Sequence, residues 1–113
     1  MRTLPLNQKA YVTLDANGNG EAYTGPLSSG EVWTGITAAV SVATNQDEAT
    51  AQLFAGAAAT PGYLQGATTW GSTGNSGPIA ATVRVGGNVF AVWTGGDPGS
   101  LATLVVTGTK TVA

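Results

Sequence analysis

Residues 31–44, EVWTGITAAVSVAT, form the longest stretch of the chain with a clear repeat, and its period is two residues. From Ile36 to Val42 every second residue is apolar, and the residues between them are Thr, Ala and Ser. This alternation predicts a β-strand with one buried face. Trp33 falls on the opposite face from Ile36, unless Gly35 hosts a β-bulge that resets the register.

Shorter segments with the same period lie on both sides of this run, and β-branched Thr and Val dominate them. Turn sequences rich in Gly, Asn and Pro separate them at intervals of roughly eight to twelve residues. The expected strands are residues 11–16, 21–24, 48–55, 79–85, 89–94 and 101–112. The pattern predicts an all-β chain folded as an antiparallel β-sandwich, jelly-roll or Ig-like, with about eight short strands.

Four segments need separate treatment. The NGNG sequence at 17–20 predicts a hairpin turn, and the Gly/Ser-rich residues 71–77 predict a loop. Residues 47–59 have an acidic, Ala-rich start that suits a short helix capped by Asn45 or Asp47, but alternation favours a strand over 48–55.

The N-terminal residues 1–10 lack strand alternation. We expect them to form an extended N-terminal arm in which Leu4 and Leu6 dock on a neighbour. A single sandwich domain over 11–113 would follow this arm.

The composition excludes several function classes. Gly, Ala and Thr make up 52 of the 113 residues, whereas charged residues make up 9% of the chain against a typical quarter. Cys and His are absent, which removes disulfides, thiolate metal sites and imidazole acid–base chemistry. Four basic residues and a net charge of −2 give no footprint for nucleic acid. No apolar run approaches a membrane span, and the start does not resemble a secretory signal, so we expect synthesis in a cytoplasm.

The sequence Asp15-x-Asn17-x-Asn19-Gly20 matches the first half of an EF-hand calcium loop. The twelfth position of such a loop needs a bidentate Glu, and here it is Pro26. We therefore favour a plain Asn-Gly turn, with calcium held by Asp15, Asn17 and Asn19, and by Glu21 as a further ligand, as the alternative.

The chain has six carboxylates, and acid–base catalysis by carboxylates needs two of them close together. Asp15 and Glu21 are the pair that a hairpin would bring together. A small sandwich with short loops offers little depth for a water-excluding pocket. Asp97 has a conformational role in an Asp-Pro-Gly turn, and Asp47-Glu48 suit a solvated loop. Because the chain also lacks a His and a Ser activator, we expect no enzyme, no catalytic residues and no cofactor.

The three Trp residues have different settings. Trp33 and Trp93 each occupy the second position of a Val-Trp-Thr-Gly sequence, and we expect both to anchor the core. Trp70 lies between Thr68-Thr69 and the Gly/Ser-rich loop, where it would anchor an interface or stack on a sugar, with Tyr63 as its companion in either case. The alternative is that Trp70 only covers one end of the sandwich.

The turns and strand ends resemble those of small virion proteins of tailed phages that infect actinobacteria. The similar residues are GEVWT at 30–34, VWTGGDPG at 92–99 and VTG at 106–108, together with the 15–20 turn and Gly25-Pro26. The resemblance runs from about Tyr11 to the end of the chain. It implies a β-sandwich structural protein without catalytic residues, exposed on a capsid or a tail.

From this resemblance we expect a capsid decoration (minor capsid) protein on the surface of the virion. Its partners would be the major capsid protein and copies of itself, most simply as a trimer. A minor tail protein is the first alternative. The second is a carbohydrate-binding module that attaches to a host glycan through Trp70 and Tyr63.

Overall fold

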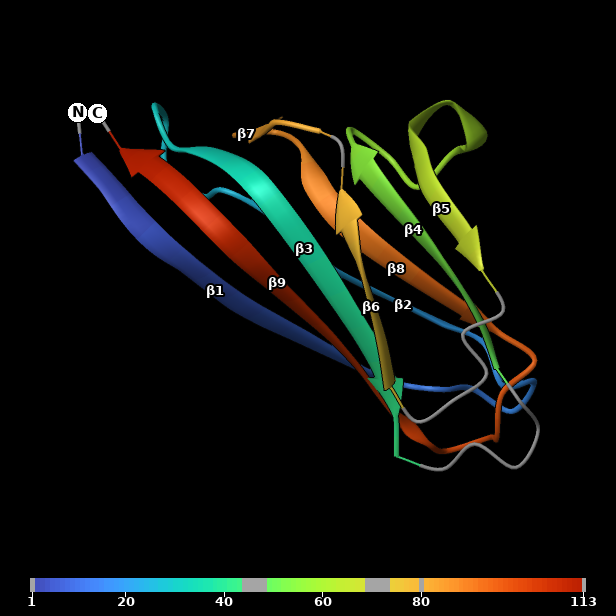
Figure 1. Cartoon of the computed structure of the whole chain (residues 1–113). Helices are drawn as coiled ribbons and strands as arrows, with labels where there is room; N and C mark the ends of the chain where they lie inside the picture. Colours follow the sequence, from blue (N-terminus) through green and yellow to red (C-terminus); the bar gives the residue numbers. More distant parts are fainter. Residues whose placement is uncertain (1, 44–48, 69–73, 80, 113) are drawn as a thin grey trace.

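The computed structural model describes residues 2–43, 49–68, 74–79 and 81–112. Nine strands in this part of the chain form two antiparallel sheets that pack face to face (Figure 1). The prediction of an all-β antiparallel sandwich is therefore confirmed. Three of the strands are long, with 12, 11 and 12 residues, and two of these three correspond to the strands expected within 31–44 and 101–112.

The larger sheet has the order β1-β9-β3-β6, and β7 also pairs with β3. Its strands are β1 (Arg2–Thr13), β3 (Val32–Val42), β6 (Gly74–Ile79), β7 (Val83–Arg84) and β9 (Leu101–Val112). The smaller sheet has the order β2-β8-β4-β5. Its strands are β2 (Gly20–Thr24), β4 (Thr50–Gly56), β5 (Leu64–Thr68) and β8 (Asn88–Thr94), with the short 3-10 helix η1 (Pro61–Tyr63) before β5.

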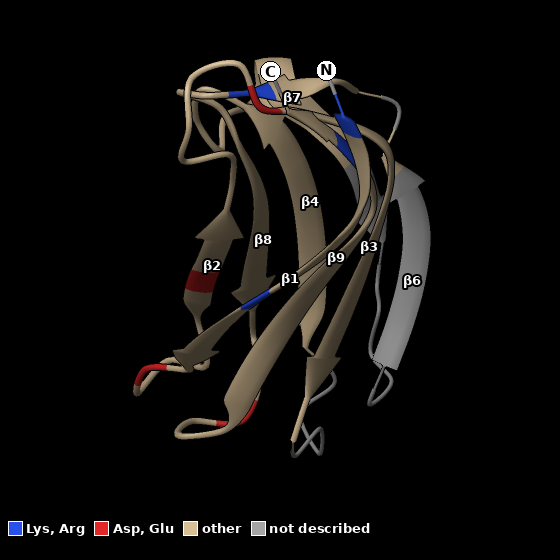
Figure 2. Ribbon diagram, turned by 90° about the vertical axis from the view of Figure 1, so that its left-hand side faces the viewer, with Lys and Arg blue, Asp and Glu red and all other residues tan. Residues whose placement is uncertain are grey.

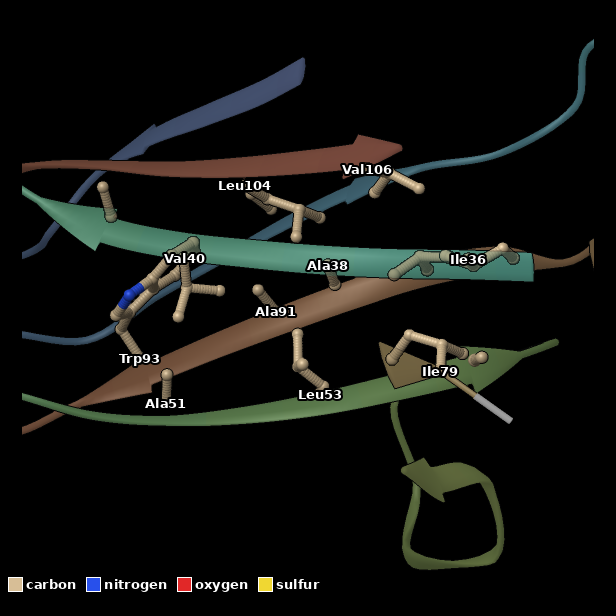
Figure 3. Packing of buried hydrophobic residues seen from close by; sticks show 14 of the residues in the cluster. Ile36, Ala38, Val40, Ala51, Leu53, Ile79, Ala91, Trp93, Leu104 and Val106 are labelled. Carbon is tan, nitrogen blue, oxygen red and sulfur yellow. The ribbon is translucent and has the colours of Figure 1, made fainter. Parts of the chain in front are cut away.

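The core lies between the two sheets and is built from alternate residues of strands in both sheets (Figure 3). Both Trp33 and Trp93 are 1% exposed, which confirms that they anchor the core. Small residues such as Ala38, Ala91 and Ala102 are fully buried beside them. Because Ala takes little space, the sheets can close around two large indole rings.

A β-bulge at Gly35 brings Trp33 to the same face of β3 as Ile36. The register between β3 and β9 shifts between Thr34 and Thr37, and Gly35 has a φ of +58°. Gly108 lies opposite, where an added Cβ would stand 2.8 Å from the Gly35 carbonyl oxygen. The bulge offered as the alternative to an outward Trp33 is therefore present, and it depends on a glycine in each strand.

The N-terminal segment is not a separate arm. Residues 2–10 are the first part of β1, and β1 pairs with β9 without interruption from Arg2–Val112 to Thr13–Leu101. Leu6 is 3% exposed and belongs to the core. The predicted boundary at residues 10 and 11 is wrong because β1 is an edge strand, and an edge strand tolerates Pro5 and a run of polar residues.

Other expected segments differ from the structure in detail. The strand expected at 48–55 is confirmed as β4, displaced by about two residues. The strand expected at 79–85 is instead divided between β6 and β7, and Val85, which would share a face with the buried Ile79 and Val83 in a continuous strand, is 50% exposed. Residues 74–77 of the expected Gly/Ser-rich loop form most of β6, and β5 had no expected counterpart. These short strands have weak alternation and obtain their hydrogen bonds from long neighbours.

Candidate functional site

Three of the four expected interface residues lie in the described part of the chain, and these three do not share one surface. Leu6 is buried in the core, and Leu4 is half-buried on the same side of β1. Tyr63 is 41% exposed at the end of η1. Trp70 lies outside the described residues. Leu6 is therefore wrong as an interface residue, and among the three described residues Tyr63 has a large exposed ring.

The Asp15–Gly20 segment forms a turn between the sheets rather than a hairpin, because β1 and β2 belong to different sheets. Asp15 Oδ1 accepts hydrogen bonds from the backbone N–H groups of Asn17 at 2.8 Å and Asn19 at 3.0 Å. The side-chain oxygen of Asn19 accepts one from Gly95 N–H at 3.1 Å. The Asp15 oxygen stabilises the turn itself, and the Asn19 oxygen links the turn to Gly95. These hydrogen bonds favour a plain turn over a calcium loop.

This turn docks on the loop between β8 and β9. Gly96 N–H donates to the Gly18 carbonyl at 2.9 Å, and Gly99 N–H donates to the Leu14 carbonyl at 2.9 Å. An added Cβ on Gly18 would collide with the carbonyl of Gly96. Two turns that are far apart in the sequence thus form one hydrogen-bonded end of the sandwich, and the absence of a side chain at Gly18 is needed for the close approach.

The hairpin expected to bring Asp15 and Glu21 together is not found in the part of the chain that the structure describes. Asp15 is in the inter-sheet turn and Glu21 is in β2, so no hairpin holds them opposite each other. Asp47 and Glu48 lie outside the described residues. Among residues 2–43, 49–68, 74–79 and 81–112, no group of three or more Asp or Glu side chains is placed to hold a metal ion. No helix in the same ranges is long and apolar enough to span a membrane.

A pocket of about 410 Å³ opens at the other end of the sandwich, near the paired ends of β1 and β9. Six of its lining residues have polar side chains, contributed by β1, β2, β8, β9 and the connection between β2 and β3: Gln8, Thr24, Ser28, Glu31, Asn88 and Lys110. Tyr23 and Leu27, which are 58% and 94% exposed, also line it. This volume is within the range of roughly 300–1,000 Å³ that is usual for small-molecule sites.

Glu31 is the centre of the polar contacts in this pocket. Its Oε1 accepts a hydrogen bond from the Trp33 indole at 3.1 Å and lies 3.9 Å from the Lys110 ammonium. The side chains of Lys110 and Glu31 are 27% and 13% exposed. The two charges are therefore close and partly screened from water, while the distance between them is too long for a hydrogen bond.

Sequence reasoning missed this pocket, although two residues carried a signal. Gln8 has the same parity in β1 as the buried Leu6, and Lys110 has the same parity in β9 as the buried Val106. Long polar side chains therefore occupy positions on the sheet face that turns toward the core. Such breaks in an apolar pattern are expected at functional sites.

Comparisons with known proteins give little beyond the fold. No family model matches the chain, and no curated protein matches it. Among solved structures, one that is similar is described as PliG of Aeromonas hydrophila, a periplasmic inhibitor of g-type lysozyme. The two share 13% sequence identity with a TM-score of 0.41, over 93% of this chain and 85% of that chain. These values are too low to transfer a function.

Proposed function

We propose that this chain is a structural protein of a bacteriophage virion, a capsid decoration protein that binds the outer shell as a homo-oligomer. It would be made in the host cytoplasm and act on the particle surface, with the major capsid protein and copies of itself as partners. The resemblance of its turns to small phage virion proteins suggests this class. The observation that carries the proposal is the outer face of the larger sheet.

That face, which we call the threonine face, consists of the outward residues of β1, β9 and β3. Eight Thr residues lie on it: Thr3, Thr13, Thr34, Thr37, Thr103, Thr107, Thr109 and Thr111. Lys9 is the one charged side chain at the outward positions of these three strands, all of which the structure describes. Figure 2 shows how sparse the charged residues are over this part of the ribbon.

A low charge matters because isolated proteins usually keep a surface of about 25–35% charged residues, which resists association. A long sheet face on which Lys9 is the one charged side chain can be covered while removing few charges from water. The threonine face therefore supports association with a shell or with further copies of the chain.

The proposal is tested first with phage particles. The protein should be found in purified virions, and particles that lack it should assemble but withstand heat less well. Cryo-EM should find it in hundreds of copies on the shell. A few copies at the tail would instead support the minor tail alternative, and absence from particles would refute both.

A matched pair of variants tests the surface itself. Ala39→Lys places a charge at the centre of the threonine face, and Gln52→Lys places one on the outer face of β4 in the other sheet. Both positions are half-buried in the free chain. We expect Ala39→Lys to reduce incorporation into particles and Gln52→Lys to leave it unchanged. Equal incorporation of the two would contradict the role given to this face.

A further inference from the structure

We propose that the pocket around Glu31 and Lys110 binds a neutral saccharide through its hydroxyl groups. The inference rests on the pocket alone and does not depend on assembly into a virion. It concerns a different place from Tyr63, which does not line this pocket.

The first argument is the balance of charge. Glu31 and Lys110 are the two charged residues that line the pocket, and their charges cancel. An anion would be attracted by Lys110 and repelled by Glu31 at nearly the same distance, and the reverse holds for a cation. A neutral ligand avoids this conflict, provided that it can both donate and accept hydrogen bonds.

The second argument is the hydrogen-bonding capacity of the charged pair. The indole of Trp33 holds Glu31 in place through Oε1. The Lys110 ammonium is 3.9 Å from that oxygen, so none of its three protons forms a hydrogen bond to it. Adjacent hydroxyl groups on a ring could donate to the carboxylate and accept from the ammonium at once, and bonds to charged groups are the stronger kind.

The third argument is the rest of the lining. Gln8 and Asn88 add amide groups that donate and accept, and Thr24 and Ser28 are hydroxyl residues. Tyr23 and Leu27 provide exposed apolar surface for the C–H groups of a sugar ring. A few fixed polar groups beside an apolar surface are what a small-molecule site requires.

The test is a titration of the ¹⁵N-labelled full chain, followed by NMR. The probes are glucose, galactose, mannose and N-acetylglucosamine, with acetate, glycine and inorganic phosphate as charged comparisons. We expect at least one sugar to shift the Trp33 indole signal saturably and to leave the Trp93 indole unmoved. The Trp33 signal is assigned with Trp33→Phe.

Variants then locate the site. Gln8→Ala and Glu31→Gln should each weaken binding of that sugar at least tenfold. Their matched controls are Asn7→Ala, one residue away on the threonine face of β1, and Glu21→Gln on the exposed face of β2. Both controls should stay within twofold of the original chain. Gln8 is exposed, so its replacement should leave the fold intact even if Glu31→Gln unfolds the protein.

Four results would overturn the proposal. One is that no sugar in the panel gives a saturable shift. Another is that acetate, glycine or phosphate binds as tightly as the best sugar, which would mean a charge-selective site. The third is that Asn7→Ala weakens binding as much as Gln8→Ala. If Glu31→Gln lowers only the melting temperature and leaves the affinity unchanged, the pair has a structural role and the proposal fails.

Discussion

At the scale of single residues, the bulge at Gly35 places Trp33 on the same core-facing side of β3 as Ile36. This bulge was foreseeable because Trp33 and Ile36 cannot share a face in a regular strand. The need for Gly108 was not foreseeable, because it follows from the pairing of β3 with β9. A sequence shows which residue can bend a strand, but the partner that must make room depends on the sheet order.

Replacing selected glycines by Ala should distinguish the loss of stability caused by backbone strain from the loss caused by steric collision. Gly35→Ala adds a methyl group with nothing within 4 Å, so it should lower the free energy of unfolding by about 1–2 kcal/mol through its positive φ alone. Gly18→Ala adds a collision with Gly96 and should destabilise more. Urea denaturation measures both changes.

The control for these two variants is Gly62→Ala. Gly62 also has free space around it but lacks a positive φ, so Ala there should change stability by less than about 1 kcal/mol. Equal losses at Gly35 and Gly62 would show that the bulge does not need a glycine.

The pocket could not be predicted from the sequence, because its polar residues are isolated from one another along the chain. Gln8 and Lys110 each interrupt an apolar alternation, but one polar residue in a strand is common on a solvated edge. Only the fold shows that both residues line the same pocket as Glu31. Glu31 lies just before β3, at the end of a turn in which its N–H donates a hydrogen bond to the Ser28 carbonyl at 3.1 Å. Contacts between such distant segments leave no spacing rule in the sequence.

At the scale of elements, β1 shows how an edge strand can be mistaken for an arm. Its N-terminal half contains Pro5 and the polar run 7–9, which weaken the alternation. The strand nevertheless pairs with β9 along its whole length, and Pro5 is tolerated because an edge strand leaves half of its N–H groups unpaired. The strong central run at 31–44 was predictable because its own alternation is uninterrupted from Ile36 to Val42.

Truncating one leucine in β1 should reveal this role. Leu6→Ala removes a side chain that is 3% exposed, and we expect it to lower the free energy of unfolding by about 2–5 kcal/mol. Leu27→Ala is the control, because Leu27 is 94% exposed and its loss should change stability by less than about 0.5 kcal/mol. Thermal and urea unfolding measure both. A negligible effect of Leu6→Ala would restore the free arm.

At the scale of the whole molecule, the first strand of the chain pairs with the last. Arg2 and Val112 are direct partners, so the first and last strands lie side by side and the two termini meet at one end (Figure 1). Pairing residues from opposite ends of the chain requires a large loop to close first. Folding should accordingly be slow for a domain of this size, in the range of milliseconds to seconds.

A circular permutant tests this closure. Joining Ala113 to Met1 with a short Gly/Ser linker and opening the chain between Ala59 and Thr60, outside the strands, should preserve cooperative unfolding. The control opens the chain between Val105 and Val106 in the middle of β9, and it should not fold. Circular dichroism during heating distinguishes the two. A first permutant that does not fold would show that the ends are not simply adjacent.

The pairing of β1 with β9 also determines how the molecule would respond to mechanical force. Both termini leave from the same end of one antiparallel pair, so tension between them would pull on a single rung of the ladder at a time, as in opening a zipper. Tension between the terminal end and the turns near Asp15 and Gly96 would load many rungs at once, in shear. The domain should therefore peel apart easily when held by its ends and resist strongly when held along its long axis.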